Sequence, residues 1–111
     1  MDEPVLRALT EPGEAYDDPS EDLIFELLRD LDIGASGTFL IVERVADTSG
    51  QTYAQALRLD DGRYTVEYRE GSADEHFTAT VTDSRAAHVV LAGWAFGLRG
   101  WRDTATWTRL R

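Results

Sequence analysis

Two histidines, His76 and His88, are the first residues whose side chains could hold a metal ion or transfer a proton. They are separated by eleven residues, so they lack the short histidine spacings of metal-binding helices and strands. Metal sites need three or four converging ligands, and the chain has no cysteine to supply the missing ones. We therefore expect no metal and no cofactor, with one histidine at the surface and the other half-buried on a helix.

Two carboxylates, Glu43 and Glu67, lie inside predicted strands and are the next candidates for chemistry. General acid–base catalysis needs a carboxylate whose pKa is shifted inside a cleft. Alternation instead places Glu67 on the same sheet face as Arg58 and near Arg69, which favours a cross-strand ion pair. The motifs GxSxG, GxGxxG and GxxxxGK[ST] are absent, and a chain without lysine forms no Schiff base. The sequence predicts no catalytic residues and a protein that is not an enzyme.

The tryptophans form the most distinctive local feature, because Trp94, Trp101 and Trp107 all lie within fourteen residues. Trp94 completes the apolar stripe of a predicted helix, so we expect it in the core. Trp101 stands between Arg99 and Arg102 in a segment bounded by glycines. Tryptophan and arginine are enriched at binding hot spots, but they also pack at core edges, and arginine stacks on tryptophan locally. A binding role and a structural role for Trp101 both stay open.

Charge is distributed unevenly along the chain. There are 21 acidic residues against 11 basic ones, all arginine, for a formal net charge of −10. Residues 1–36 hold eleven acids and two arginines (net −9), whereas 85–111 hold five arginines and one acid (net +4). The two ends either attract each other within the monomer, or the acidic end faces a basic partner. An acidic protein repels nucleic acid and anionic membranes, so we expect it to bind neither.

These side chains must be positioned by a small number of elements, which the hydrophobic pattern places along the chain. Ser20 and Asp83 or Ser84 are suited to cap the two helices, and Gly34 and Gly97 to end them. We expect helices at 20–32 and 84–96 and strands at 38–45, 52–59, 63–69, 76–82 and 104–110. Residues 1–19 contain all three prolines and are read as an acidic arm with a short helical turn at 4–10, preceding a single domain at 20–111.

Asp61-Gly62 predicts a two-residue type I′ hairpin between the second and third of these strands. Such a loop pairs Leu59 with Tyr64, Leu57 with Val66 and Gln55 with Tyr68 on one large-residue face. The opposite face is then polar, with the residues Ala54, Ala56, Arg58, Thr65, Glu67, Arg69, Thr78 and Thr80. This polar face is open to solvent, covered by the 1–19 arm, or used by a partner.

The predicted fold class is α+β: an antiparallel meander of four to five strands with both helices on one face, in the order α-β-β-β-β-α-β. With 111 residues, one domain can bury a core without disulfides. The N-terminus lacks the basic and apolar regions of a secretory signal, and no apolar run approaches the roughly 20 residues of a membrane span. We therefore expect a cytoplasmic protein.

The segments 39–44, 60–71, 75–77, 93–97 and 100–103 resemble short actinobacterial proteins. The plan of residues 20–110 also resembles small immunity proteins of bacterial polymorphic toxin systems. This resemblance implies a bacterial, cytoplasmic protein that blocks a toxin domain by direct contact, and acidic immunity proteins commonly face basic nuclease toxins.

We therefore expect a non-catalytic protein-binding protein, either a monomer or a homodimer, acting as an immunity or antitoxin-type inhibitor of a basic toxin domain. The alternatives are a small-molecule-binding or enzymatic domain with a pocket between sheet and helices, and a structural homodimer. The residues expected at the partner-binding surface are Trp101, Arg99, Arg102, Arg58, Glu67, Arg69, Asp17, Asp18, Glu21 and Asp22.

Overall fold

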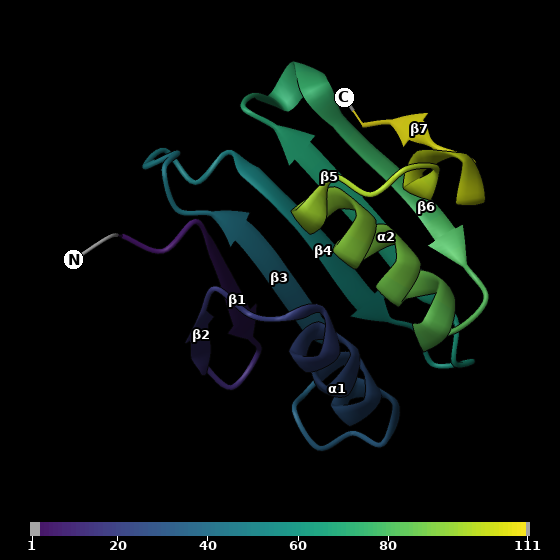
Figure 1. The fold of residues 1–111 in the computed structure, drawn as a ribbon. Coiled ribbons are helices and arrows are strands. Elements are labelled where there is room, and N and C mark those ends of the chain that lie inside the picture. Colours follow the sequence, from purple (N-terminus) through teal and green to yellow (C-terminus); the bar gives the residue numbers. More distant parts are fainter. Residues whose placement is uncertain (1–2, 111) are drawn as a thin grey trace.

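The computed structural model describes residues 3–110 as one antiparallel sheet backed by two α-helices (Figure 1). The elements in chain order are β1 (Leu6–Thr10), β2 (Ala15–Asp17), α1 (Glu21–Asp32), β3 (Phe39–Arg44), β4 (Thr52–Arg58), β5 (Tyr64–Glu70), the 3₁₀ turn η1 (Ala73–Glu75), β6 (His76–Val81), α2 (Ser84–Phe96), the 3₁₀ turn η2 (Trp101–Thr104) and β7 (Thr108–Arg109). Seven strands lie in the order β2-β1-β3-β4-β5-β6-β7. The α+β class is confirmed, whereas four to five strands was an undercount.

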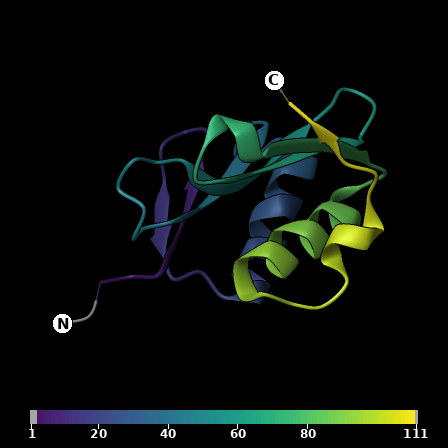
Figure 2. The same cartoon turned by 90° about the horizontal axis from the view of Figure 1, so that it is seen from above.

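Both helices pack on the same face of the sheet, which we call the inner face (Figure 2). The opposite, outer face carries neither helix. No helix among residues 3–110 has both the length and the apolar content to cross a membrane.

The expectation of a helical turn at 4–10 followed by a loop is wrong, because residues 6–17 supply two strands of the sheet. β1 pairs with β3 along its whole length, and Leu6, Ala8 and Thr10 are buried on the inner face. Asp18 holds the end of this hairpin, since its Oδ1 accepts hydrogen bonds from the backbone N–H groups of Val5 (2.8 Å) and Leu6 (3.0 Å). Residues 6–17 thus extend the sheet and do not lie over its outer face.

The predicted register of the β4–β5 hairpin is also wrong, by one residue. Arg58 pairs with Tyr64 and Ala56 with Val66, because the loop has three residues and not two. Gly62 alone takes a left-handed conformation (φ 89°), and its N–H donates to the carbonyl of Leu59, as in a type I turn followed by a bulge. A shift of one residue turns every side chain of β4 to the other face.

The physical reason for this register lies in the packing against α2. The shift places Ala54 and Ala56, which are fully buried, beneath the helix, and turns Leu57 to the outer face. Arg58 also moves to the inner face, where its Nη1 lies 3.4 Å from the carbonyl of Asp32. The expected polar face therefore loses Ala54, Ala56 and Arg58.

The helices begin as predicted. The hydroxyl of Ser20 accepts a hydrogen bond from Leu23 N (3.0 Å), and the carboxylate of Asp83 accepts one from Ala86 N (2.9 Å). Such caps satisfy backbone N–H groups that have no partner within the helix. Asp32 then ties the two helices to the sheet, because it accepts hydrogen bonds from the hydroxyls of buried Tyr64 (2.6 Å) and of Ser84 (2.5 Å).

The C-terminal strand is much shorter than the predicted 104–110. Thr104 is the last residue of η2, residues 105–107 lie outside any strand, and only Thr108 and Arg109 pair with β6. β7 with two residues and β2 with three therefore form the two edges of the sheet.

Candidate functional site

An apolar groove of about 190 Å³ lies between α2 and η2, next to the start of α1. Its floor and rim are formed by Glu21, His88, Val89, Ala92, Leu98, Arg99, Gly100, Trp101 and Thr104. Three of the residues predicted for a partner-binding surface, Glu21, Arg99 and Trp101, meet here although they come from distant parts of the sequence. We call this hollow the helix groove.

Two glycines after α2 shape the helix groove. Gly97 ends the helix in a left-handed conformation (φ 65°), and the N–H of Leu98 donates to the carbonyl of Gly93 (3.0 Å). Gly100 is also left-handed (φ 82°) and turns η2 back against the helix. A Cβ on Gly93 would overlap the side chain of Trp101, so a glycine is required at this contact.

Trp101 is half-buried and forms one wall of the groove. Its ring meets those of Tyr68 (centroids 5.2 Å apart) and Trp107 (6.0 Å) edge to face. The guanidinium of Arg102 stacks over Trp101, 5.3 Å from the ring centroid, and over Tyr68 at 5.2 Å. Aromatic clusters of this kind stabilise packing beyond their buried area. Trp101 therefore has a structural role, and one side of it lines the groove.

The apolar floor was not predicted from the sequence. Val89 and Leu98 have 41% and 45% of their surfaces exposed. Ala92 of α2 is buried and lines the bottom of the groove. His88 supports the wall toward α1, because its ring packs edge to face on Phe25 and its Nε2 lies 3.1 Å from the carbonyl of Glu21. Exposed aliphatic side chains beside a rigid wall form a surface that an apolar group of a partner can bury.

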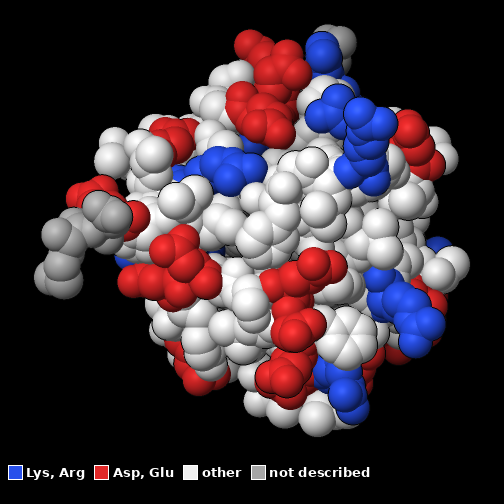
Figure 3. All heavy atoms as spheres, viewed as in Figure 1, with Lys and Arg blue, Asp and Glu red and all other residues white. Residues whose placement is uncertain are grey.

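Acidic side chains extend along α1 from the groove, in what we call the α1 acidic row. Asp22, Glu26 and Asp30 repeat every four residues, so they lie along one side of the helix, and Glu21 joins them at its first turn. None of these four carboxylates forms an ion pair within residues 3–110. Figure 3 shows acidic side chains in a row over α1, whereas basic side chains gather nearer the C-terminal strand.

This arrangement bears on the two interpretations of the uneven charge. In the described part of the chain, the ion pairs are Arg7–Asp17, Arg63–Asp61 and Arg109–Glu75, and His76–Glu67 is a fourth only when the histidine is protonated. None of these pairs joins the acidic residues before 37 to the arginines after 84. Within residues 3–110, the acids before residue 37 are thus left without direct compensation from the arginines after residue 84.

A second hollow of about 250 Å³ follows the same side of α1. It is lined by Glu26, Arg29, Asp30 and Ile33, and Ile33 is 77% exposed. An exposed aliphatic side chain again lies beside unpaired carboxylates. The acidic row therefore has an apolar position near each end.

The remaining predicted residues lie elsewhere. Asp17 pairs with Arg7 (2.7 Å), and Asp18 is engaged by backbone N–H groups, so both serve the β1–β2 hairpin. Glu67 and Arg69 lie on the outer face, where Glu67 Oε1 is 2.8 Å from His76 Nε2. The prediction that Glu67 shares a sheet face with Arg58 is wrong, because Arg58 lies on the inner face.

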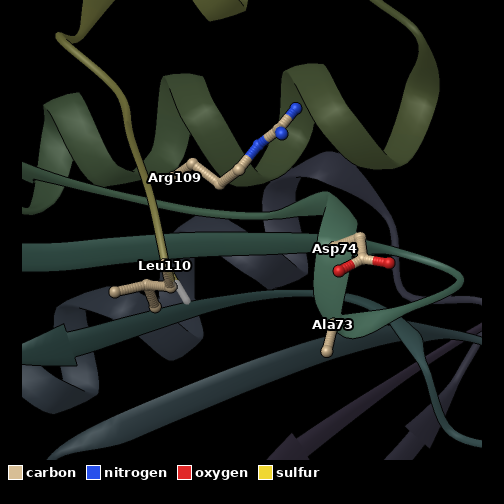
Figure 4. Close-up of a pocket in the computed structure, with 4 residues that line it drawn as sticks. All are labelled: Ala73, Asp74, Arg109 and Leu110. Carbon is tan, nitrogen blue, oxygen red and sulfur yellow. The ribbon is translucent and has the colours of Figure 1, made fainter.

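A further hollow of about 330 Å³ lies beside β7 (Figure 4). Ala73 and Asp74 of the η1 turn line one side of it, and Arg109 and Leu110 line the other. The guanidinium of Arg109 stacks over Phe77, with its carbon 5.4 Å from the ring centroid, and reaches Glu75 only at 4.0 Å. No predicted site residue lines this hollow.

Among residues 3–110, no three His, Asp or Glu side chains gather closely enough to hold a metal ion. Comparison of the chain with protein-family models finds no match, and comparisons with curated proteins and with solved structures find none either.

Proposed function

We propose that the protein is a non-catalytic binding protein whose α1–α2 side docks on a basic partner protein. The observation that carries this proposal is the position of the helix groove, an apolar hollow lined by Glu21, which is the first member of the α1 acidic row. The four carboxylates of this row form no ion pair within residues 3–110. A partner that inserts an apolar side chain into the groove can place arginine or lysine side chains along the α1 acidic row. Inhibition of a basic toxin domain, as by an immunity protein, is the function that fits this surface.

Charge and apolar contact play different parts in this proposal. Unpaired surface charges raise the rate of association with a partner of opposite charge, and salt screens that effect. Buried aromatic and aliphatic anchors set the lifetime of the complex. We therefore expect the acidic row to govern association and the groove to govern dissociation.

A small-molecule site in the helix groove is the weaker candidate. Ligand pockets generally enclose about 300–1,000 Å³. The groove holds about 190 Å³ and has no buried polar side chain directed into it. Its size suits one side chain of a protein better than a whole metabolite.

The test is differential capture with charge-matched variants. D22R/E26R reverses two members of the acidic row, and D60R/D74R makes the same charge change in exposed turns outside it. L98D places a charge in the groove, and L110D does so at a leucine of similar exposure beside β7. We expect a basic protein that is retained by wild type and by both control variants, and lost with D22R/E26R and with L98D.

The captured protein is then purified and its kinetics are measured against salt. D22R/E26R should lower the association rate at least about tenfold at low salt, and L98D should mainly raise the dissociation rate. Capture that is the same for all five proteins, or association that does not depend on salt, would refute the proposal.

A further inference from the structure

The outer face of the sheet is a second surface, separate from the helix groove. It is formed by the odd-numbered residues of β1, β3, β4 and β5 and the even-numbered residues of β6. Its apolar members, Leu9, Phe39, Ile41, Tyr53 and Leu57, gather on β1, β3 and β4. A sheet face with this many large apolar side chains is typical of a face that packs against another layer.

The charge of the outer face differs from that of the molecule as a whole. It carries two arginines, Arg7 and Arg69, and two carboxylates, Glu43 and Glu67, and Asp17 of β2 lies beside Arg7 on the same side of the sheet. Its net charge is therefore −1 while His76 is uncharged. The whole chain has a formal net charge of −10. A second copy of this chain would therefore meet much less repulsion at the outer face than at the α1 acidic row.

The register gives the outer face a near two-fold pattern about its central strand. β4 is the fourth of seven strands, and Tyr53 on it pairs with Glu43 of β3 on one side and with Arg69 of β5 on the other. A two-fold axis along β4 would exchange these two sides. Glu43 of each copy would then face Arg69 of the other copy.

We propose that two copies of the chain associate through their outer faces, with a two-fold axis along β4 and two reciprocal Glu43–Arg69 ion pairs. Sheets that pack face to face lie about 10 Å apart. An arginine and a glutamate side chain together can bridge that distance. The angle of about 30° between aligned sheets displaces residues least near the point where the two β4 strands cross, and both residues lie one strand away from β4.

The present partners of these side chains leave room for such pairs. The Nε of Arg69 is enclosed and has no hydrogen-bond partner within residues 3–110. Glu43 forms no ion pair there, because its neighbour Arg7 is bound to Asp17. A buried donor without an acceptor is destabilising, so a change in the Arg69 side chain that lets it donate to Glu43 of the second copy would be favoured.

Other arrangements are less favourable. A two-fold axis that crosses the strands at Gln55 would bring Glu67 of one copy against Glu67 of the other, because Gln55 and Glu67 are directly paired and lie in the same row across the sheet. Pairing through the sheet edges is limited because β2 and β7 have only three and two residues. On the axis along β4, Leu57 faces its own copy and forms an apolar contact.

The size of the face predicts a weak dimer. Five strands of about six residues span about 24 Å by 20 Å, which is about 480 Å² of flat area per copy. Two copies would together cover roughly 1,000 Å², near the lower limit for specific interfaces. Dimerisation should therefore be measured up to several hundred micromolar.

Sedimentation velocity from about 5 to 500 µM tests the proposal on the full chain. We expect concentration-dependent dimers for wild type and at least a tenfold weaker association for E43R and for R69E. The double variant E43R/R69E has the net charge of wild type and recreates both pairs with reversed sign, so it should dimerise again. D60R and R85E make the same single charge changes outside the face and should behave as wild type.

Unfolding midpoints of all variants establish that each is folded. If E43R or R69E does not fold, the neutral variant E43Q or R69Q is used in its place. A wild type that stays monomeric at 500 µM would overturn the proposal. So would a double variant no better than the single ones, because simple charge repulsion or misfolding explains that result. Either outcome leaves the helix groove and its partner untouched.

Discussion

Gly93 and Trp101 are in direct contact, at a distance that admits no side chain on the glycine. A Cβ at position 93 would overlap the Cβ of Trp101 and lie 2.5 Å from its Cγ. The other side of α2 packs against the sheet, so α2 and η2 cannot move apart freely to make room for a side chain at position 93. The wall of the helix groove thus depends on a glycine inside a helix, where alanine would otherwise be the better residue.

Gly93→Ala should destabilise the protein by about 1–3 kcal/mol, as overpacking of a core contact does. Without the clash, the same change in a helix would stabilise by up to about 1 kcal/mol. Urea unfolding followed by circular dichroism measures the difference. In a Trp101→Gly background the clash is absent, so Gly93→Ala should no longer destabilise. Equal effects in both backgrounds would contradict the contact.

The register of β4 predicts opposite outcomes for neighbouring positions. Ala56→Asp places a charge beneath α2, where the alanine is fully buried, and should lower the free energy of unfolding by more than about 3 kcal/mol. Gln55→Glu lies on the outer face and should change it by less than about 0.5 kcal/mol. The two-residue loop expected from Asp61-Gly62 requires the reverse order, so this pair of variants decides between the registers.

Replacing Asp18 with alanine should destabilise the protein more than replacing it with asparagine. Its backbone is left-handed (φ 47°), and its carboxylate accepts hydrogen bonds from Val5 and Leu6. Asp18→Ala loses both hydrogen bonds and should lower the free energy of unfolding by about 1–2 kcal/mol. Asparagine keeps the acceptor and tolerates this conformation, so Asp18→Asn should lose less than half of that. Equal losses would show that the side-chain oxygen does not hold the hairpin.

Tyr64 should make the protein sensitive to alkaline pH. Burial, and then its hydrogen bond to Asp32, raise the pKa of its hydroxyl above the ordinary value of 10.0. The folded state therefore keeps the proton when the unfolded state has lost it, so this stability is complete below pH 10 and falls as the pH rises above it. Urea midpoints between pH 8 and about 11.5 should fall less steeply for Tyr64→Phe than for wild type. Parallel curves would contradict the assignment.

Local signals in the sequence predicted the helices well and the sheet only in part. Ser20 and Asp83 mark helix starts because a side-chain cap is decided within a few residues of chain. Leu6 to Thr10 was missed because Leu9 points to the outer face, so the short run does not alternate cleanly between apolar and polar. The hairpin register was missed because Asp-Gly suits loops of two or three residues, and packing of Ala54 and Ala56 against α2 decides between them.

The candidate site was predicted only where single residues carry a signal. Trp101 and Arg99 were marked by residue type, and Glu21 by its place in an acidic segment. Val89 and Leu98 were not found, because an isolated aliphatic residue has no pattern that distinguishes a groove floor from a core edge. Their proximity depends on the two left-handed glycines that fold η2 back onto α2, a tertiary effect.

The clustering of the tryptophans has a spectroscopic consequence. The Nε1 of Trp94 donates a hydrogen bond to Glu70 (3.1 Å), and the rings of Trp101 and Trp107 both contact Tyr68. All three indoles therefore lie around the C-terminal end of β5. Fluorescence excited selectively at tryptophan therefore reports on this corner alone, whereas circular dichroism averages over the whole chain. If the two signals change at the same urea concentration, the corner that carries the groove unfolds together with the rest of the molecule. If fluorescence changes first, the groove opens as a unit of its own, and a partner would bind a surface that is itself in equilibrium.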